Sequence, residues 1–358
     1  MRYLIAHTLP HNMCVKYNTS VACANFTWPL IDSNVFDKCF SILPINVWGN
    51  IDDIHMNDLA YNKCLRSSKY FHLFAPIWEN IMLFPKIKKG SSVWLYNISI
   101  LNIVLYFLIK WFKPTVKLYV MILDFMNPEK KSKLDYLILW ALNHANGTIR
   151  VSNWEHFTCK NSRCLPGVVP ADNPEFPRQD TISKTFLLSG LLRKDISQID
   201  LVIDAFSKLP DVELYISGFA ADEDNIREKC KSHRNIHFLG CIEYNRYMEL
   251  LNNVSFVMSM RNPKLIENKC NFPSKIIEAI LHNKIIVSTI HYEQLNGLKY
   301  FEVSSDCNSL IADIQRIISI EKGELMLFAN QAEYAKKHFS PAAWNMAMKT
   351  IESRDSTL

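Results

Sequence analysis

Strand-like and helix-like segments alternate through the second half of this 358-residue chain, and this alternation constrains the fold most. Short apolar runs rich in β-branched residues read as strands, and the segments between them carry apolar residues at helical spacing. The expected strands are 184–189, 212–217, 236–239, 254–259 and 285–287, and the expected helices include 197–208, 222–232, 244–252 and 308–320. The alternation predicts a parallel sheet with helices on both faces, because parallel neighbours need a crossover connection.

The loops after these strands collect residues suited to a ligand site. Gly190, Gly218, Gly240 and Arg261 each lie just past the end of an expected strand. Doubly wound sheets bind their ligands at the carboxyl ends of the strands. The spacing therefore predicts one crevice lined by several loops.

The segment 271–285 adds charge to this crevice. Pro273 and Ser274 are residue types that begin helices, and Lys275 follows them. Free amides, a helix dipole and a cation together suit a diphosphate, whereas Glu278, one turn later, suits a ribose diol. Glu278 lies in an apolar run and needs a partner, which ribose hydroxyls or a structural lysine would supply. The segment predicts a nucleotide-diphosphate pocket.

The first half is less regular but also alternates. Its expected strands are 2–7, 39–47, 92–97, 116–123, 148–152 and 164–170, and its expected helices lie near 18–30, 70–84, 99–112 and 129–145. Residues 171–182 hold two prolines and no periodicity, which is typical of a linker. The last segment, 326–352, is a long helical pattern interrupted near Ser340 and Pro341. A chain of this length favours two domains.

Charge is distributed unevenly between the two halves. Residues 1–170 hold 18 Lys and Arg against 10 Asp and Glu, while residues 171–358 hold 22 against 25. The basic half carries three local clusters, namely Lys86, Lys88 and Lys89; Lys110, Lys113 and Lys117; and Lys130, Lys131 and Lys133. These clusters either are ordinary solvated surface or attract an anionic partner. That partner would be lipid headgroups or a pyrophosphate-linked lipid. Nucleic acid is not expected, because no stacking module accompanies the charge.

The cysteines and apolar stretches point to a globular chain without a span. The ten cysteines include no Cys-x-x-Cys pair and no zinc-ligand spacing, so we expect reduced, mostly buried thiols. The apolar stretch 98–112 is shorter than the ~20 residues that a membrane span needs. It favours a core helix, or else a membrane-facing patch beside Lys110, Lys113 and Lys117. The first ten residues do not read as a signal peptide.

Five short motifs in the second half carry a family resemblance. They are Leu188-Ser189-Gly190-Leu191-Leu192, Asp204-Ala205-Phe206, Leu214-Tyr215-Ile216-Ser217-Gly218, Ile236-His237-Phe238-Leu239-Gly240 and Phe272-Pro273-Ser274-Lys275-Ile276-Ile277-Glu278-Ala279. Their order and spacing over residues 166–300 resemble the nucleotide-sugar-binding domain of GT-B glycosyltransferases. The resemblance is closest to the retaining group that builds bacterial capsules, exopolysaccharides and O-antigens.

The resemblance implies an α/β fold with two Rossmann-like domains facing a central cleft and a C-terminal helix crossing back to the N-domain. The implied parts are an acceptor-binding domain at 1–170, a linker at 171–182, a nucleotide-sugar domain at 183–335 and the returning helix at 336–358. The implied activity is metal-independent hexosyl transfer, without a cofactor, from a UDP- or GDP-sugar to a saccharide acceptor. A lipid-linked acceptor in surface polysaccharide synthesis and a cytoplasmic, peripheral membrane location are expected.

The resemblance also assigns candidate residues. The donor-binding candidates are Gly190, Arg193, Lys194, Gly218, Cys241, Ile242, Arg261, Asn271, Ser274, Lys275 and Glu278, and the catalytic candidates are Asp124 and Lys275. The backbone at Cys241 and Ile242 would meet a uracil or guanine edge. For several candidates a structural role stays open: a solvated loop for Arg193 and Lys194, a salt bridge for Arg261, and a cap for Asn271 and Asp124.

The chain departs from the family pattern at three places. The turn after the first strand, 8–12, has no glycine. The family's paired glutamates have seven residues between them, but counting back from Glu278 reaches Cys270. The Lys-Gly pair that usually precedes the first helix of the second domain is replaced here by Ser197-Gln198. These departures leave open an inverting GT-B transferase, a nucleotide-sugar epimerase, or a non-catalytic protein that binds nucleotide sugar or serves as a scaffold.

Overall fold

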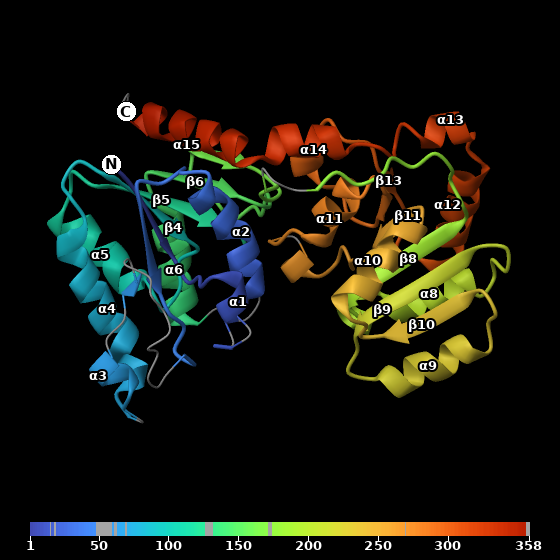
Figure 1. Cartoon of the computed structure of the whole chain (residues 1–358), viewed down its shortest axis with the longest axis horizontal. Helices are drawn as coiled ribbons and strands as arrows, with labels where there is room; N and C mark the ends of the chain where they lie inside the picture. The colour runs from blue at the N-terminus through green and yellow to red at the C-terminus, as the bar shows by residue number, and fades with distance from the viewer. Residues whose placement is uncertain are drawn as a thin grey trace. The chain divides into compact units, whose positions relative to one another are not determined.

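The computed structural model describes residues 1–14, 16–17, 19–47, 59–60, 63–68, 70–125, 132–170, 174–268 and 270–355. The chain divides into two compact units (Figure 1). The first unit comprises Met1–Ala171 and Phe339–Leu358, and the second comprises Asp172–His338. Each unit contains its own parallel sheet, which confirms the expected α/β class.

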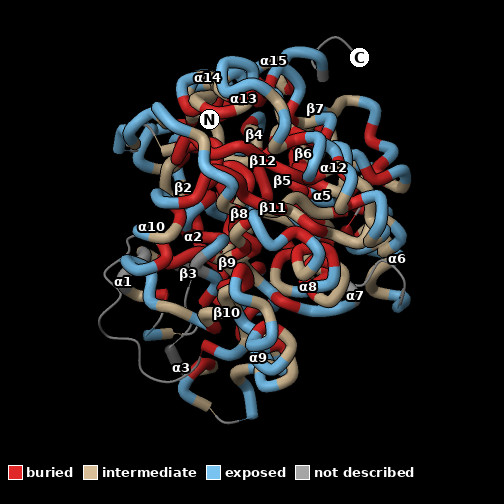
Figure 2. Tube along the Cα trace, turned by 90° about the vertical axis from the view of Figure 1, so that its right-hand side faces the viewer, coloured by how far each residue is buried: buried red, intermediate tan, exposed pale blue. Residues whose placement is uncertain are grey.

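The sheet of the first unit has the strand order β3-β2-β1-β4-β5-β6-β7 among the described residues, with every neighbouring pair parallel. Its strands are β1 (Arg2–Ala6), β2 (Lys38–Ile42), β3 (Leu59–Ala60), β4 (Ser92–Tyr96), β5 (Lys117–Ile122), β6 (Gly147–Arg150) and β7 (Ser162–Cys164). Its helices are α1 (His11–Cys14), α2 (Val21–Asp32), α3 (Lys63–Arg66), α4 (Ala75–Leu83), α5 (Ile103–Phe112), α6 (Lys133–Asn143) and α15 (Pro341–Asp355). The central strands are buried almost throughout, as expected when helices cover both faces (Figure 2).

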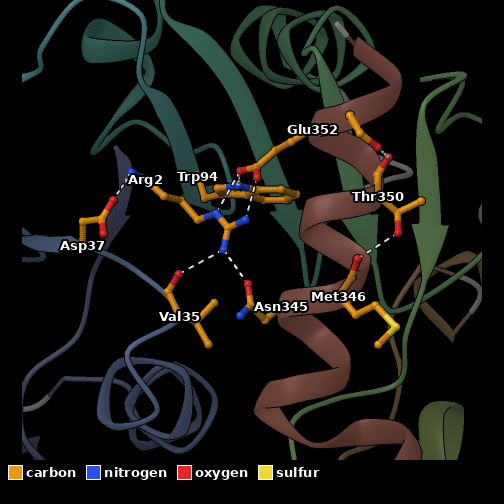
Figure 3. Close-up of polar contacts among 9 residues, drawn as sticks. Arg2, Val35, Asp37, Trp94, Asn345, Met346, Thr350 and Glu352 are labelled. Atoms are coloured by element: carbon orange, nitrogen blue, oxygen red, sulfur yellow. Dashed lines mark hydrogen bonds and ion pairs between the residues drawn. The ribbon is translucent and has the colours of Figure 1, made fainter. Parts of the chain in front are cut away.

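The C-terminal helix α15 packs on the first unit, as the family resemblance implied (Figure 3). The Arg2 guanidinium donates to both carboxylate oxygens of Glu352, at 2.9 and 2.6 Å. The indole of Trp94 donates to the same carboxylate at 2.8 Å, and Arg2 also reaches Asn345 at 2.7 Å. One carboxylate on α15 therefore ties the helix to the first strand of the sheet and to β4.

The sheet of the second unit has the order β10-β9-β8-β11-β12-β13 among the described residues, again all parallel. Its strands are β8 (Thr185–Leu191), β9 (Glu213–Phe219), β10 (Ile236–Gly240), β11 (Phe256–Ser259), β12 (Ile285–Ser288) and β13 (Phe301–Glu302). Its helices are α7 (Lys194–Ser197), α8 (Ile199–Phe206), α9 (Glu223–Lys231), α10 (Tyr244–Asn253), α11 (Lys275–Leu281), α12 (Cys307–Ser319), α13 (Lys322–Leu325) and α14 (Ala332–Phe339).

Several expected boundaries differ from the structure. The strand expected at 164–170 is wrong: β7 ends at Cys164, because Pro166 and Pro170 cannot donate to a ladder. The helix expected at 99–112 begins only at Ile103, after a turn in which Asn102 accepts from the backbone of Ser99. Parts of other expected segments lie outside the described residues, namely 18, 129–131 with Lys130 and Lys131, 171–173 of the linker, and 356–358 of the returning helix.

Candidate functional site

A pocket of about 330 Å³ lies at the carboxyl ends of β8, β9 and β10 in the second unit. Loops after these strands form one side, and α10 and α11 form the other. The lining residues are Gly190, Ser217, Gly218, Phe219, Cys241, Ile242, Tyr244, Tyr247, Lys275 and Glu278. Six of the residues that the sequence singled out thus line one pocket: Gly190, Gly218, Cys241, Ile242, Lys275 and Glu278.

The glycines of this pocket hold space that a side chain would fill. Gly218 has φ +149°, and a Cβ there would lie 1.9 Å from the carbonyl oxygen of Gly190. Gly190 has φ +120°, and a Cβ there would lie 3.5 Å from Cε of Lys275. The two strand ends therefore approach closely, and the lysine stem passes over bare backbone.

Lys275 is held over an aromatic ring. Its Nζ lies 4.3 Å from the ring centroid of Tyr247. Burial lowers the pKa of Lys275, and the nearby Glu278 carboxylate partly opposes this shift. A cation that has lost part of its solvent shell gains most from an anionic ligand.

Glu278 is held by the same tyrosine. The hydroxyl of Tyr247 donates to Oε2 of Glu278 at 2.9 Å and lies 3.4 Å from Oγ of Ser189. Tyr247 is only 8% exposed, and burial together with the Glu278 charge raises its pKa, so the phenol stays a donor. The partner of Glu278 is therefore a tyrosine, where the sequence suggested ribose or a lysine. The sequence did not signal this role, because Tyr247, buried on α10 together with Leu251, has the pattern of a core residue.

Three other donor candidates engage protein groups away from the pocket lining. Lys194 lies 3.3 Å from Asp200, which also accepts from Lys229 at 2.6 Å. Arg261 is largely enclosed and donates to the side-chain oxygens of Asn268 and Asn271. Burial lowers the pKa of the Arg261 guanidinium. The expected cations thus stabilise their own loops in this structure.

Arg193 and Ser274 begin helices, and both are exposed. Ser274 takes the expected N-cap position but makes no side-chain cap hydrogen bond among the described residues. The helix that it precedes, α11, spans only Lys275–Leu281. Because α11 is so short, we attribute the attraction for a diphosphate to the charge of Lys275 and not to the helix terminus.

A polar cluster lies at the carboxyl ends of β1, β4 and β5 in the first unit. Asp124, which follows β5, accepts from the Asn97 side chain at 2.8 Å. Desolvation raises the pKa of Asp124, and the Asn97 hydrogen bond opposes this. His7 lies 3.0 Å from the carbonyl oxygen of Ile42, and burial lowers its pKa to about 4. Asp124 is not the N-cap of α6, a position that Ser132 takes.

A larger pocket of about 600 Å³ lies beside the edge strand β13 of the second unit. It is lined by residues within 291–302 and 324–328. His291 pairs with Glu302 at 2.6 Å, and Lys299 lies 5.9 Å from the ring centroid of Phe328. His291 and Glu302 therefore engage each other here, and Lys299 lies over a ring, whereas Lys275 and Glu278 line the first pocket together.

The sequence matches no protein-family model and no curated protein. Solved structures do match. The catalytic domain of starch synthase IV from Arabidopsis thaliana, bound to ADP and acarbose, has a TM-score of 0.64 at 9% identity, covering 100% of this chain and 99% of that chain. HepE of Anabaena, in complex with UDP and glucose, has a TM-score of 0.60 at 13% identity, covering 99% and 100%.

A TarM mutant of S. aureus, in complex with fondaparinux, alpha-GlcNAc-glycerol and UDP, has a TM-score of 0.53 at 14% identity. That match covers 78% of this chain, which spans 59% of the TarM chain. Such likenesses, at low identity, establish the fold. The chain has the GT-B fold of two Rossmann-like units, which the motifs in 166–300 predicted.

Proposed function

We propose that the chain is a glycosyltransferase that takes a sugar from a nucleoside-diphosphate donor. One observation carries the proposal: Lys275 and Glu278 are fixed on the same tyrosine in a pocket at glycine-lined strand ends. The cation suits a diphosphate and the carboxylate suits a ribose diol. Doubly wound sheets bind nucleotides at this edge.

The chemistry follows from the charge that develops on the leaving group. As the bond between the sugar and the diphosphate stretches, negative charge grows on the diphosphate, and the sugar becomes oxocarbenium-like. A desolvated ammonium aimed at the diphosphate stabilises that state more than the ground state. We assign this role to Lys275 and propose that the transfer is metal-independent. Asp124, in the other unit, is proposed to act as acid/base or to position the acceptor.

We also propose the donor and the acceptor of this transfer. UDP- or GDP-sugar is the proposed donor, with the base edge against the backbone of Cys241 and Ile242. Support comes from HepE and TarM, whose structures hold UDP. The proposed acceptor is a lipid-linked saccharide in surface polysaccharide synthesis. A hexosyl donor, a retaining outcome and a cytoplasmic location, peripheral to the membrane, complete the proposal.

Thermal-shift titration with UDP, GDP, dTDP and CMP tests donor binding. A ligand that binds only the folded state stabilises it by about 2.7 kcal/mol at a hundred times its Kd. We expect the shift to be largest for UDP or GDP and to be lost in Lys275→Ala. The matched control is Lys231→Ala, an exposed lysine paired with Glu228 on α9. A full shift in Lys275→Ala, or no shift with any nucleotide, would contradict the proposal.

A non-catalytic nucleotide-sugar-binding protein is the second candidate, and Cys270 favours it. Cys270 is buried, with its thiol directed to the carbonyl oxygen of Glu267 at 3.5 Å, where the family pattern places a glutamate. Slow hydrolysis of the donor separates the two functions. A transferase leaks sugar to water, and the anomer first released distinguishes retention from inversion. Donor that binds but is never hydrolysed or transferred supports the second candidate.

A further inference from the structure

A broad apolar face lies on the surface of the first unit, on the segment that ends with α4. Phe71, Phe74, Trp78 and Ile81 recur at helical spacing and are 43–59% exposed. Leu73, Ile77 and Met82 are also exposed. Single exposed apolar side chains are common on folded proteins. A contiguous cluster of large ones marks an interaction site.

The end of α5 extends this face. Helices α4 and α5 pack against each other (Figure 1). The ring centroids of Phe84 and Phe112 lie 6.4 Å apart, with the rings edge to face. Phe112 and its neighbour Trp111 are 66% and 67% exposed. We call the exposed apolar residues within 71–82 together with Trp111 and Phe112 the aromatic face.

The exposed charges of the segment 70–117, which carries the aromatic face, have one sign. The segment 70–117, all of which is described, contains the lysines Lys86, Lys88, Lys89, Lys110, Lys113 and Lys117. Its single carboxylate, Glu79, is buried and pairs with Arg66 at 2.7 Å. Lys113 lies 4.4 Å from the ring centroid of Phe84 and donates to its carbonyl oxygen at 2.6 Å. Within this segment the solvent thus meets aromatic rings and ammonium groups, and no exposed carboxylate.

We infer that the aromatic face docks on an anionic lipid bilayer. Aromatic side chains are favoured at the membrane interface, and lysines beside them are attracted to anionic headgroups. None of the described helices could serve as a membrane span. We infer a contact at the bilayer surface. The inference rests on the proposed function only in its choice of a lipid partner, which would bring the protein to a lipid-linked acceptor.

A second copy of the chain fits this surface less well. In a two-fold dimer each patch meets the same patch, so lysines around one aromatic face would meet the lysines of the other. Like charges brought together in this way cost free energy unless carboxylates offset them. Anionic headgroups supply that opposite charge.

Vesicle flotation with the full-length protein tests the inference. Phosphatidylglycerol-containing phosphatidylcholine vesicles should bind the wild type, and pure phosphatidylcholine vesicles should bind it at least about tenfold more weakly. Phe74→Ser with Trp78→Ser should reduce binding at least about tenfold. Lys86→Gln, Lys88→Gln and Lys89→Gln together should reduce it about a hundredfold and remove most of its salt dependence. The control Met346→Ser removes a 70% exposed side chain on α15 and should leave vesicle binding unchanged.

Three results would overturn the inference: equal binding of the Phe74/Trp78 variant and the wild type, equal binding to both vesicle types, or a dimer that these substitutions disrupt while the wild type ignores vesicles. Thermal shift with the nucleotide is measured on the same variants. An unchanged shift shows that they are folded and that the donor pocket is intact. Failure of vesicle binding therefore leaves the donor proposal standing, and failure of the nucleotide shift leaves the membrane inference standing.

Discussion

The substitution Tyr247→Phe tests the central arrangement of the pocket, because it removes one hydroxyl and keeps the ring beneath Lys275. The lost hydrogen bond is made to a carboxylate, a kind that contributes about 1.5–3 kcal/mol. Glu278 is only partly buried, so the lower end applies, about 1.5 kcal/mol. For a domain of this size, 1 kcal/mol shifts Tm by about 2–4 °C, so Tm should fall by about 3–6 °C.

Ligand binding should separate the two halves of the pocket. Without its phenol partner, Glu278 is less firmly placed, and the affinity for UDP should fall about tenfold. Inorganic pyrophosphate, which lacks the ribose, should bind Tyr247→Phe as well as the wild type, because Lys275 keeps its place over the ring. Isothermal titration with both ligands measures the two effects.

Tyr334→Phe is the matched control for this experiment. Its hydroxyl donates to the carbonyl oxygen of Asn296 at 3.0 Å, in the same unit but outside the pocket. It should lower stability by about 1 kcal/mol and leave both affinities unchanged. In a double-mutant cycle, the effects of Tyr247→Phe and Glu278→Gln on the free energy of unfolding should be coupled by more than about 0.5 kcal/mol. Additive effects, or an equal loss of pyrophosphate and UDP affinity, would refute the reasoning.

Three further predictions concern single groups. Lys275→Met should weaken pyrophosphate and UDP binding by about 1.5–3 kcal/mol in titrations without lowering Tm, because burial already disfavours the free cation; a fall in Tm without loss of affinity would contradict this. Glu352→Gln should lower the urea-unfolding free energy by about 1–3 kcal/mol, since Arg2 and Trp94 lose their shared carboxylate, and an unchanged midpoint would argue against the role given to this contact. The pKa of His7 is about 4 in the fold and 6.5 when unperturbed, so the unfolded chain binds the proton first as pH falls. Stability should therefore decrease between pH 6.5 and 4 by at most about 1.4 kcal/mol per pH unit, and His7→Gln should flatten the slope.

The second sheet was predictable because its strands are short apolar runs separated by helical patterns. Segments such as 285–287 stand out, since a strand covered on both faces is apolar on both sides. The order of the strands and the two-residue strand β13 could not be predicted, because pairing depends on contacts between distant segments. The break at Ser340 and Pro341 was visible because proline begins a helix easily but rarely continues one.

The candidate site was only partly predictable. Gly190, Gly218, Lys275 and Glu278 could be placed at one pocket, because glycines at strand ends and charged residues in apolar runs are visible in a sequence. Their donor-binding roles stay predictions. Tyr247 was missed, since a tyrosine on the apolar face of a helix reads as core.

The roles of Arg193, Lys194, Arg261, Asn271 and Ser274 stay predictions. The position of a residue close to a strand-end glycine in the sequence does not determine where its side chain points. In this structure Lys194 meets Asp200, and Asn271 meets Arg261.

The most direct test is a crystal structure with the nucleoside diphosphate that gives the largest thermal shift. We expect the diphosphate within salt-bridge distance of Nζ of Lys275, beside Gly190. We also expect the ribose hydroxyls to donate to Glu278 while Tyr247 keeps its bond to that carboxylate. A nucleotide bound elsewhere, such as the pocket beside β13, or one whose phosphates avoid Lys275, would contradict it.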